Sequence, residues 1–215
     1  MSEERPVDRV YRTLKEQISS RQLSPNESLI EQQIAQECGV SRATVKKAIL
    51  MLEQDGLVLV EANKSARVRA FSKAEVHDFL EFRQELEGYI ARMATPYFSD
   101  QDIADLERII EEMRVFKEAG QLMEYSKNNQ VFHNKIMEKC PNHLAVEITQ
   151  TLKTRMRKYN TRTILVPGRA DHSFAEHNAI LDAIRRHSPE DAEKAMRYHI
   201  AQVQKEFEEN FELFM

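Results

Sequence analysis

The chain has 215 residues, enough for one large domain or two small ones, and its formal net charge is −4 at pH 7. Its 41% hydrophobic and 31% charged residues exclude global disorder, and it has neither the long apolar run of a transmembrane helix nor, in MSEERPVDRVYRTL, the apolar core of a secretory signal. The two cysteines lie far apart in unrelated patterns, so a reduced cytoplasmic protein is expected.

The first predicted elements are two helices joined by a turn. In DRVYRTLKEQISSRQ, the apolar residues Val10, Leu14 and Ile18 recur every four positions, which is typical of one buried helical face. LSPNESL then predicts a turn, and LIEQQIAQECG predicts a short helix that ends at Gly39, a residue suited to a helix C-terminus.

A third helix and a hairpin complete this region. VSRATVKKAILMLEQDG predicts a helix that Ser41 caps and Gly56 ends, with an apolar stripe from Val45 to Leu52. LVLVEANKSARVRA predicts two short strands around a polar tip at residues 62–65. The order helix, helix, turn, helix, hairpin is that of a winged helix-turn-helix, so residues 1–70 are predicted to form a DNA-binding domain.

Beyond this region the sequence shows only helical patterns. Six amphipathic segments follow one another, at residues 72–98, 99–120, 121–140, 142–164, 166–188 and 189–214. The predicted fold class is therefore mainly α, with an N-terminal winged helix-turn-helix followed by an all-α antiparallel bundle of about six helices. We place a linker at residues 71–77 and the bundle at residues 78–215.

Basic and small polar side chains at the start of the third helix and in the hairpin predict contact with double-stranded DNA. Residues 1–70 carry a net charge of +1 and residues 71–215 carry −5, so any DNA contact must be local. Arg42 is suited to a guanine edge, and the other side chains to phosphates or to the minor groove beside the hairpin tip. The predicted DNA-contacting residues are Ser41, Arg42, Thr44, Lys46, Lys47, Lys64, Ser65 and Arg67. The alternative is a solvated basic face.

The stretch LIEQQIAQECGVSRATVKKAILMLEQDGLVLVEANKSARV resembles the N-terminal domain of the GntR family of bacterial transcription regulators. The family pattern is roughly L-x-E-x-x-L-A-x-x-x-G-V-S-R-x-P-V-R-x-A-L-x-x-L-x-x-x-G-L, followed by a wing, and the resemblance covers about residues 8–70. It implies that Ser41, Arg42, Thr44 and Lys46 occupy DNA-contacting positions. Three residues depart from the pattern: Lys46 replaces an Arg and loses its bidentate fork, Thr44 replaces a Pro, and Ser65 replaces the wing Gly.

Three histidines of the predicted bundle form a candidate metal site. His133 follows Asn129 by four residues on one helical face, His177 lies on the next helix but one, and His199 lies on the last helix. Side chains from three helices can converge inside a bundle, and imidazoles suit Zn²⁺ or Ni²⁺. No local motif such as C-x-x-C or H-E-x-x-H accompanies them, so it stays open whether they are ordinary helix-face histidines. The remaining histidines are expected to be ordinary: His77, His143, His172 and His187.

The segments FRQELEGYIARMA, NNQVFHNKI, FAEHNAILDAI and EDAEKAMRYHI resemble the C-terminal FCD effector domain of the FadR subfamily. This resemblance spans nearly all of residues 75–212. It implies an effector-binding and dimerisation domain in which a divalent transition metal, most simply Zn or Ni, is held by Asn129, His133, His177 and His199. Asn129 replaces the usual Asp, which weakens one ligand and removes a negative charge, and this favours an anion beside the metal.

The same resemblance implies a cavity for a small carboxylate-type metabolite. Arg83 is at a position that faces the cavity in such domains; alternatively it pairs with Glu87, one turn later, on a surface. Ser173 lies one turn before His177 and is predicted either to hydrogen-bond the ligand or to cap its helix.

Taken together, these features predict a ligand-responsive transcription regulator, and more specifically a repressor. One winged helix contacts too few base pairs for a unique site, so a homodimer on a pseudo-palindromic operator is expected. Two alternatives are a constitutive DNA-binding dimer without metal or effector, and a metalloenzyme with a DNA-targeting domain. The sequence supplies no nucleophile motif or placed general base for the latter, so no catalytic residue is predicted.

Overall fold

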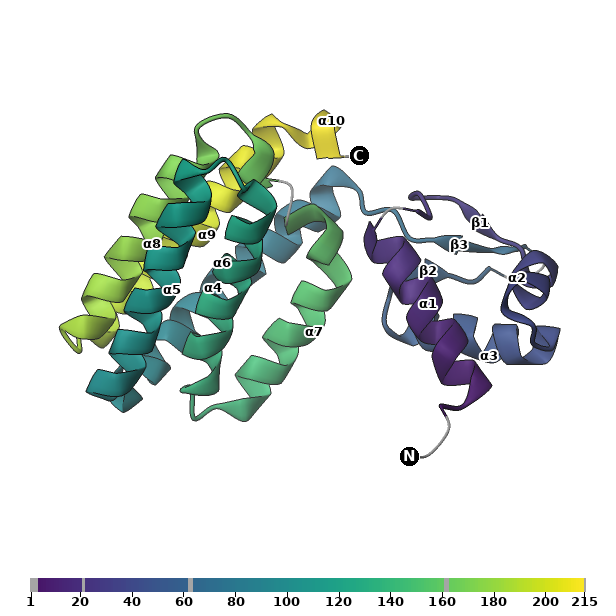
Figure 1. The fold of residues 1–215 in the computed structure, drawn as a ribbon, viewed down its shortest axis with the longest axis horizontal. Helices are drawn as coiled ribbons and strands as arrows, with labels where there is room; N and C mark the ends of the chain where they lie inside the picture. Colours follow the sequence, from purple (N-terminus) through teal and green to yellow (C-terminus); the bar gives the residue numbers. More distant parts are fainter. Residues whose placement is uncertain (1–3, 21, 62–63, 161–162, 215) are drawn as a thin grey trace. The chain divides into compact units, whose positions relative to one another are not determined.

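The computed structural model describes residues 4–20, 22–61, 64–160 and 163–214, apart from the side chains of 155–160 and 214. These residues form two compact units, which divide between Ser72 and Lys73 (Figure 1). The first is a three-helix domain with a small sheet, and the second is entirely helical. The predicted fold class, a winged helix-turn-helix followed by an all-α bundle, is confirmed.

The first unit is a winged helix-turn-helix with one strand more than expected. Its sheet is antiparallel with the order β1-β3-β2, and Ser28 of β1 pairs with Arg67 of β3. LSPNESL was predicted as a turn only; β1 was missed because a two-residue strand is too short to show alternation. The elements of this unit are α1 (Pro6–Ser20), β1 (Ser28–Leu29), α2 (Glu31–Cys38), α3 (Arg42–Gln54), β2 (Val58–Leu59) and β3 (Ala66–Val68).

The core of the first unit lies between α1, α3 and the sheet. The apolar stripes predicted on α1 and α3 are buried, Val10 and Val45 completely, and they pack with residues of β1, β2 and β3. Between α2 and α3 the chain turns at Gly39, whose φ of 64° lies in the left-handed region that favours glycine. The turn sets the start of α3 at the surface, where its first residues are exposed.

The second unit contains the six predicted helices and a short one at the end of the chain. The helix α4 begins at Lys73, so most of the linker expected at 71–77 is the first turn of α4, and Val76 in that turn is buried. The helices are α4 (Lys73–Ala94), α5 (Asp100–Glu118), α6 (Leu122–Glu138), α7 (His143–Asn160), α8 (Arg169–Arg185), α9 (Pro189–Glu209) and α10 (Phe211–Phe214), with 3-10 turns at Thr95–Tyr97 and Thr163–Leu165.

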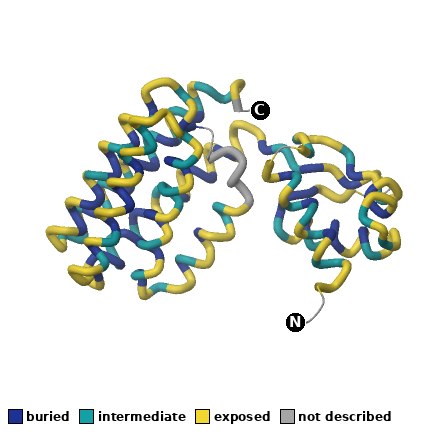
Figure 2. Tube along the Cα trace, in the orientation of Figure 1, coloured by how far each residue is buried: buried dark blue, intermediate teal, exposed yellow. Residues whose placement is uncertain are grey.

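One continuous core holds this bundle together. It takes apolar side chains from α4, α5, α6, α8 and α9, and the longest helices, α4 and α9, pack most extensively on each other. Figure 2 shows buried and exposed segments alternating along these helices, as expected for amphipathic helices around a core. No helix in the described part of the chain has both the length and the apolar character needed to cross a membrane.

A glycine permits the close approach of α4 and α9. Gly88 lies buried in the middle of α4, and a Cβ added to it would meet Cγ of Arg197 on α9 at 2.6 Å. A glycine inside a helix is destabilising by roughly 1 kcal/mol relative to alanine. Close packing of the two helices is the physical reason that this position accommodates only a hydrogen.

We therefore expect Gly88→Ala to destabilise the bundle, even though alanine has a higher helix propensity than glycine. Overpacking of a well-packed position costs about 1–3 kcal/mol, which exceeds the propensity gain. Urea unfolding followed by circular dichroism measures the change. In the double variant Gly88→Ala with Arg197→Ala the clash is removed, so the loss due to Gly88→Ala should largely disappear; an equal loss in both backgrounds would contradict the steric explanation.

Candidate metal centre and DNA-reading helix

The start of α3 presents the predicted DNA-contacting side chains at the surface. The Ser41 hydroxyl caps α3 by accepting the Thr44 N–H at 3.2 Å, so its cap role is confirmed. Arg42 is exposed and lies 3.6 Å from the carboxylate of Glu31 on α2, while Lys46 and Lys47 are exposed. An exposed pair of this kind contributes little to stability, so it leaves Arg42 available to another acceptor.

The predicted wing contacts are also at the surface. Lys64 pairs with Glu61. Ser65 and Arg67 are exposed, and Arg67 lies on β3, opposite Ser28 of β1. Residues 62 and 63 of the predicted tip lie outside the described residues. The structure thus brings one face of α3 and the described part of the wing to the surface of a single small domain.

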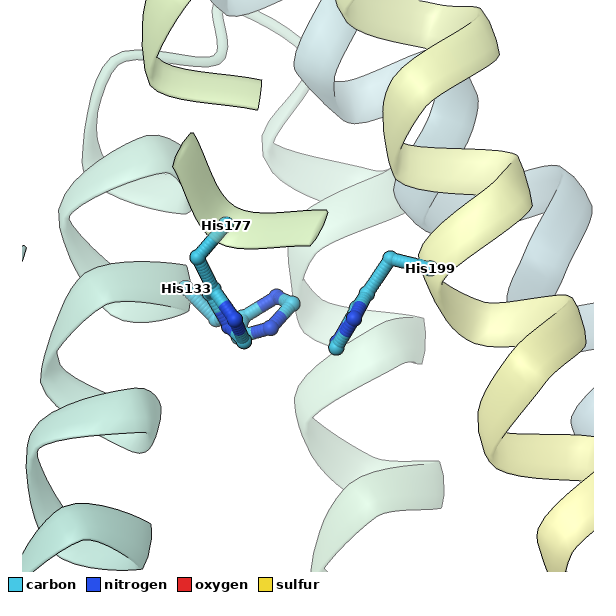
Figure 3. A group of neighbouring side chains, drawn as sticks. All are labelled: His133, His177 and His199. Atoms are coloured by element: carbon cyan, nitrogen blue, oxygen red, sulfur yellow. The ribbon is translucent and has the colours of Figure 1, made fainter. Parts of the chain in front are cut away.

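The three histidines predicted as metal ligands meet in the core of the second unit. His133 comes from α6, His177 from α8 and His199 from α9, and all three are at most 2% exposed. One ring nitrogen from each lies within 4.8 Å of the others. Figure 3 shows the three rings converging. The ring centroids lie 4.5–5.4 Å apart. Spacing along the sequence left this convergence open.

Each ring has its Nδ1 close to an acceptor, and for His177 and His199 the two form a hydrogen bond. For His177 this is the Ser173 backbone carbonyl at 2.6 Å, and for His199 it is a Glu176 carboxylate oxygen at 2.7 Å. Nδ1 of His133 lies 2.8 Å from a carboxylate oxygen of Glu87. An Nδ1–H facing an acceptor leaves the Nε2 lone pair free in a neutral imidazole, which is the arrangement of metal-ligating histidines.

Few hydrogen-bond donors lie near the Nε2 atoms of His133 and His177. Neither ring nitrogen of His133 makes a hydrogen bond among the described residues, because the close approach of its Nδ1 to Glu87 does not have hydrogen-bond geometry. Nε2 of His177 lies 2.8 Å from Oδ1 of Asn129, so two acceptors face each other. A turned amide that donates through Nδ2 satisfies this contact, and so does a cation bound by both atoms at about 2.1 Å. Three imidazole nitrogens and an amide oxygen therefore fit a divalent transition metal as a donor set.

Burial keeps all three imidazoles neutral. Desolvation lowers the pKa of His133 to about 3 and that of His199 to about 4. It also lowers the pKa of His177 well below its usual range, and the neighbouring His199 adds to this. Neutral rings are the form in which histidine binds a metal ion.

Two buried groups of ion-paired side chains contact the histidines, one through Glu87 and one through Glu176. Glu87 contacts Arg83, on the preceding turn of α4, and lies 3.5 Å from Nζ of Lys153. Burial alone would raise the pKa of Glu87, but the charges of Arg83 and Lys153 outweigh it and hold this pKa well below its usual range. Arg83 does pair with Glu87 as one alternative predicted, but the pair is buried rather than on a surface.

The second group is formed by Arg169 and Glu176, both on α8. The guanidinium donates in bidentate fashion to the carboxylate, at 3.0 and 2.7 Å. Burial raises the pKa of Glu176, yet the hydrogen bonds from His199 and Arg169 bring it below the usual value. Glu176 therefore fixes the ring orientation of His199, and Arg169 neutralises the charge of Glu176.

A cavity of about 420 Å³ opens beside the histidines. Arg83 faces it, as the resemblance implied, and so does Ser173. Ser173 lies inside α8, whose N-cap is Gly168, so of its two predicted roles the helix cap was wrong; its hydroxyl accepts from Tyr125 at 3.0 Å. The cavity is lined by Arg83, Ser126, Asn129, Gln130, His133, Asn134, Gln150, Lys153, Thr154, Thr163, Ile164, Arg169, Ser173, His199 and Val203.

Sequence reasoning missed four charged residues of this centre. Glu87 was considered only as a surface partner of Arg83, and Glu176 precedes a candidate ligand without having been singled out. Lys153 and Arg169 carry no local pattern, because only the packing of α7 and α8 brings them to the cavity wall. The histidines expected to be ordinary, His77, His143, His172 and His187, are exposed.

Comparisons with known proteins agree with both halves of this arrangement. Residues 6–68 match the family described as bacterial regulatory proteins, gntR family, and residues 78–202 match the FCD domain. The HTH-type transcriptional repressor RspR of Escherichia coli is 23% identical over 92% of this chain and 87% of its own length. The Uxu operon regulator of Haemophilus influenzae is 28% identical over 93% and 80%. The solved structure of E. coli McbR/YncC has a TM-score of 0.72 at 21% identity and covers 99% and 98% of the two chains.

The buried histidines predict how stability depends on pH in the metal-free protein. Their folded-state pKa values lie below the unfolded value near 6.5, so the unfolded chain takes up protons first as the pH falls. The stability is complete above about pH 6.5 and is lost below it, by roughly 1 kcal/mol per pH unit for each histidine. We expect a loss of about 3 kcal/mol between pH 7.0 and 5.5 in urea titrations with a chelator.

The exposed His187 provides the control for this experiment. His187→Gln should leave the pH dependence unchanged, because this side chain is in solvent. If the wild-type protein were equally stable at the two pH values, the three core histidines would have to be protonated in the folded state, contrary to their burial.

Proposed function

The chain belongs to the FCD-domain group of the gntR family of bacterial regulatory proteins, and is a transcription regulator; we propose that a small organic acid, bound beside a divalent metal in the bundle, controls its affinity for an operator. The observation that carries this proposal is the convergence of three neutral histidines on one point beside a cavity with a cationic wall. The regulators named above match this chain over most of their own length, and RspR is named a repressor.

The DNA-binding half of the proposal rests on the exposed start of α3. Arg42 is assigned to a guanine edge, and the other polar and basic residues of α3 and the wing to phosphates and the neighbouring minor groove. We assign these contacts to Ser41, Arg42, Thr44, Lys46, Lys47, Lys64, Ser65 and Arg67. A homodimer on a pseudo-palindromic operator supplies two such surfaces, because one domain covers too few base pairs for a unique genomic site.

The metal half rests on the donor set. His133, His177 and His199 supply three Nε2 atoms and Asn129 an amide oxygen, which suits Zn²⁺ or Ni²⁺. When bound, such an ion supplies a Lewis-acidic centre to which a carboxylate oxygen coordinates. The protein's own part is to hold the rings neutral and oriented, through Glu87, Glu176 and the Ser173 carbonyl.

The cavity supports an acidic effector. Among the described residues that line it, three are cationic, namely Arg83, Lys153 and Arg169, and none is a carboxylate. Its volume of about 420 Å³ accommodates on the order of a dozen water-sized groups, which matches a small metabolite. Ser173 places a hydroxyl beside the same space and serves as a further hydrogen-bonding group for the effector.

Regulation follows from linkage. An acid that binds one arrangement of the bundle more tightly shifts the population towards it, and the affinity for DNA changes by the same coupling free energy. Repression that the acid relieves is the form we propose. The constitutive-dimer alternative predicts an operator affinity that is indifferent to metal and acid. The metalloenzyme alternative departs from the named relatives, which are transcription regulators.

Arg42→Ala should weaken binding to the operator far more than binding to random DNA. Loss of a bidentate guanine contact costs about 1–3 kcal/mol, or roughly tenfold or more. The operator is first selected from a random library with wild-type protein, and affinities are then measured by fluorescence anisotropy at one salt concentration. Lys47→Ala, which removes an exposed cation from the same helix, should weaken binding to operator and to random DNA by the same factor. Equal losses on both DNAs for Arg42→Ala would assign it to phosphate instead.

His177→Ala should abolish uptake of Ni²⁺ or Zn²⁺ while operator affinity stays within threefold. The ring contributes a ligand to the metal, but it lies in the core of the second unit, whereas α3 belongs to the first unit. Calorimetry on untagged, chelator-stripped protein measures metal uptake, and His143→Ala, at an exposed histidine, is the matched control. Undiminished metal uptake by His177→Ala would refute the proposed metal centre, whereas lost operator binding with intact folding would give the cluster a structural role.

A further inference from the structure

Among the lysines whose side chains the structure describes, Lys153 is the one that lines the cavity of the second unit. It lies on α7 with its side chain 19% exposed, and its Nζ is 3.5 Å from a carboxylate oxygen of Glu87. That separation is longer than an ordinary hydrogen bond, whereas Lys117 donates to Asp171 at 2.6 Å. The amine of Lys153 is therefore held less tightly than that of Lys117, and it lies at the wall of a cavity.

The surroundings of Lys153 favour the neutral form of its amine. Burial lowers the pKa of Lys153 to about 8, and the charge of Arg83 lowers it further, while the carboxylate of Glu87 opposes both. A lysine in water has a pKa near 10.4, so at pH 7.5 the neutral fraction of Lys153 is larger by on the order of a hundredfold. The neutral amine is the form that attacks a carbonyl carbon.

The same cavity offers binding groups for a carboxylate and for a carbonyl oxygen. Arg169 lines it and directs two N–H groups at Glu176, and a guanidinium carries five N–H donors in all. Gln150, one turn before Lys153 on α7, lines it as well and has an amide that can donate to a carbonyl oxygen. An acid held in this cavity can therefore place a second functional group at the amine.

From this placement, and resting on the proposed function, we infer that the effector is an acid that also carries an aldehyde or ketone group, and that Lys153 binds it covalently and reversibly as an imine. The carboxylate of the effector pairs with the cationic wall, and its carbonyl carbon meets Nζ of Lys153. The metal takes no part in this bond.

The chemistry is a condensation that needs no oxidant or reductant. The lone pair of Nζ forms a bond to the carbonyl carbon, the carbonyl π pair moves to the oxygen, and one amine proton passes to that oxygen through water. The resulting carbinolamine loses its hydroxyl group and the second amine proton as water, which leaves a C=N bond. Uptake of one proton by the imine nitrogen then gives a cation, which keeps a positive charge beside the carboxylate of Glu87. Addition of water reverses each step and releases the acid.

Reductive trapping tests for the imine in the full-length, untagged protein. Glyoxylate, pyruvate or 2-oxoglutarate is added with sodium cyanoborohydride, which reduces a protonated imine to a stable secondary amine, and peptide mass spectrometry locates the product. We expect at least one of these acids to label Lys153 at least tenfold faster than the exposed Lys127 and Lys205. An excess of the matching 2-hydroxy acid should slow the labelling of Lys153 alone, because it occupies the same cavity.

The pH profile separates a buried amine from an exposed one. The ratio of labelling at Lys153 to labelling at Lys205 should fall above about pH 8, because Lys153 is then neutral while the exposed amine continues to lose its proton. A ratio is used because the reactivity of the reagent with pH cancels in it.

Calorimetry without the hydride reagent measures what the covalent bond contributes to binding. The wild type should bind the labelling oxo acid at least tenfold more tightly than the matching hydroxy acid. In Lys153→Arg, which keeps a positive charge but has no amine nucleophile, this preference should fall below threefold. Lys205→Arg is the matched control and should keep it. The trapping experiment uses only wild-type protein, so it decides the question even if Lys153→Arg fails to fold.

The outcomes distinguish the imine from the acid site itself. If Lys153 is labelled no faster than Lys205, and oxo and hydroxy acids bind equally well, the imine is refuted while an acidic effector stands. Fast labelling that the hydroxy acid does not slow, without a preference for the oxo acid, would show a reactive lysine that is no effector site, and would also refute the inference. If acids of neither class bind, the proposed effector fails, and the imine fails with it.

Discussion

Three imidazole rings packed side by side in an apolar core have to be both neutral and anchored, and much of the bundle is arranged around this requirement. Each ring has a nitrogen that must find an acceptor in the interior. Two of the acceptors are carboxylates, Glu87 and Glu176, and a buried carboxylate in turn needs its own partner. The result is a layered shell in which cations hold carboxylates and carboxylates hold rings. The cations of this outer layer become the wall of the cavity.

The two units use charge in opposite ways. On α3 and the wing the ionic side chains are exposed, and pairs such as Arg42 with Glu31 are weak in water, so DNA can replace them at little energetic cost. In the bundle the ionic groups are buried, and Arg169 with Glu176 is a bidentate pair whose disruption would leave a charge without a partner. The exposed basic surface of the first unit is therefore adaptable, whereas the buried charged cluster of the bundle is preorganised.

The sequence predicted what depends on local periodicity and failed where tertiary packing decides. The apolar stripes of α1 and α3, the cap at Ser41 and the order of the bundle helices all follow from spacing, and the structure bears them out. The strand β1 was missed because it exists only through pairing with β3. Spacing placed Asn129 and His133 on one face, but the meeting of three histidines needed the registers of three different helices.

The charged residues behind the histidines show the same limit more sharply. The spacing of Arg83 and Glu87 predicted a pair, yet nothing local showed that the pair is buried. Lys153 reaches Glu87 only because α7 packs chiefly against α4. The cavity is lined by residues of α4, α6, α7, α8 and α9, so the effector proposed for it would contact all five helices. A ligand in contact with all five helices would change how they pack on one another. Helix packing is in turn the property that an effector domain has to change if it is to alter the affinity of the chain for DNA.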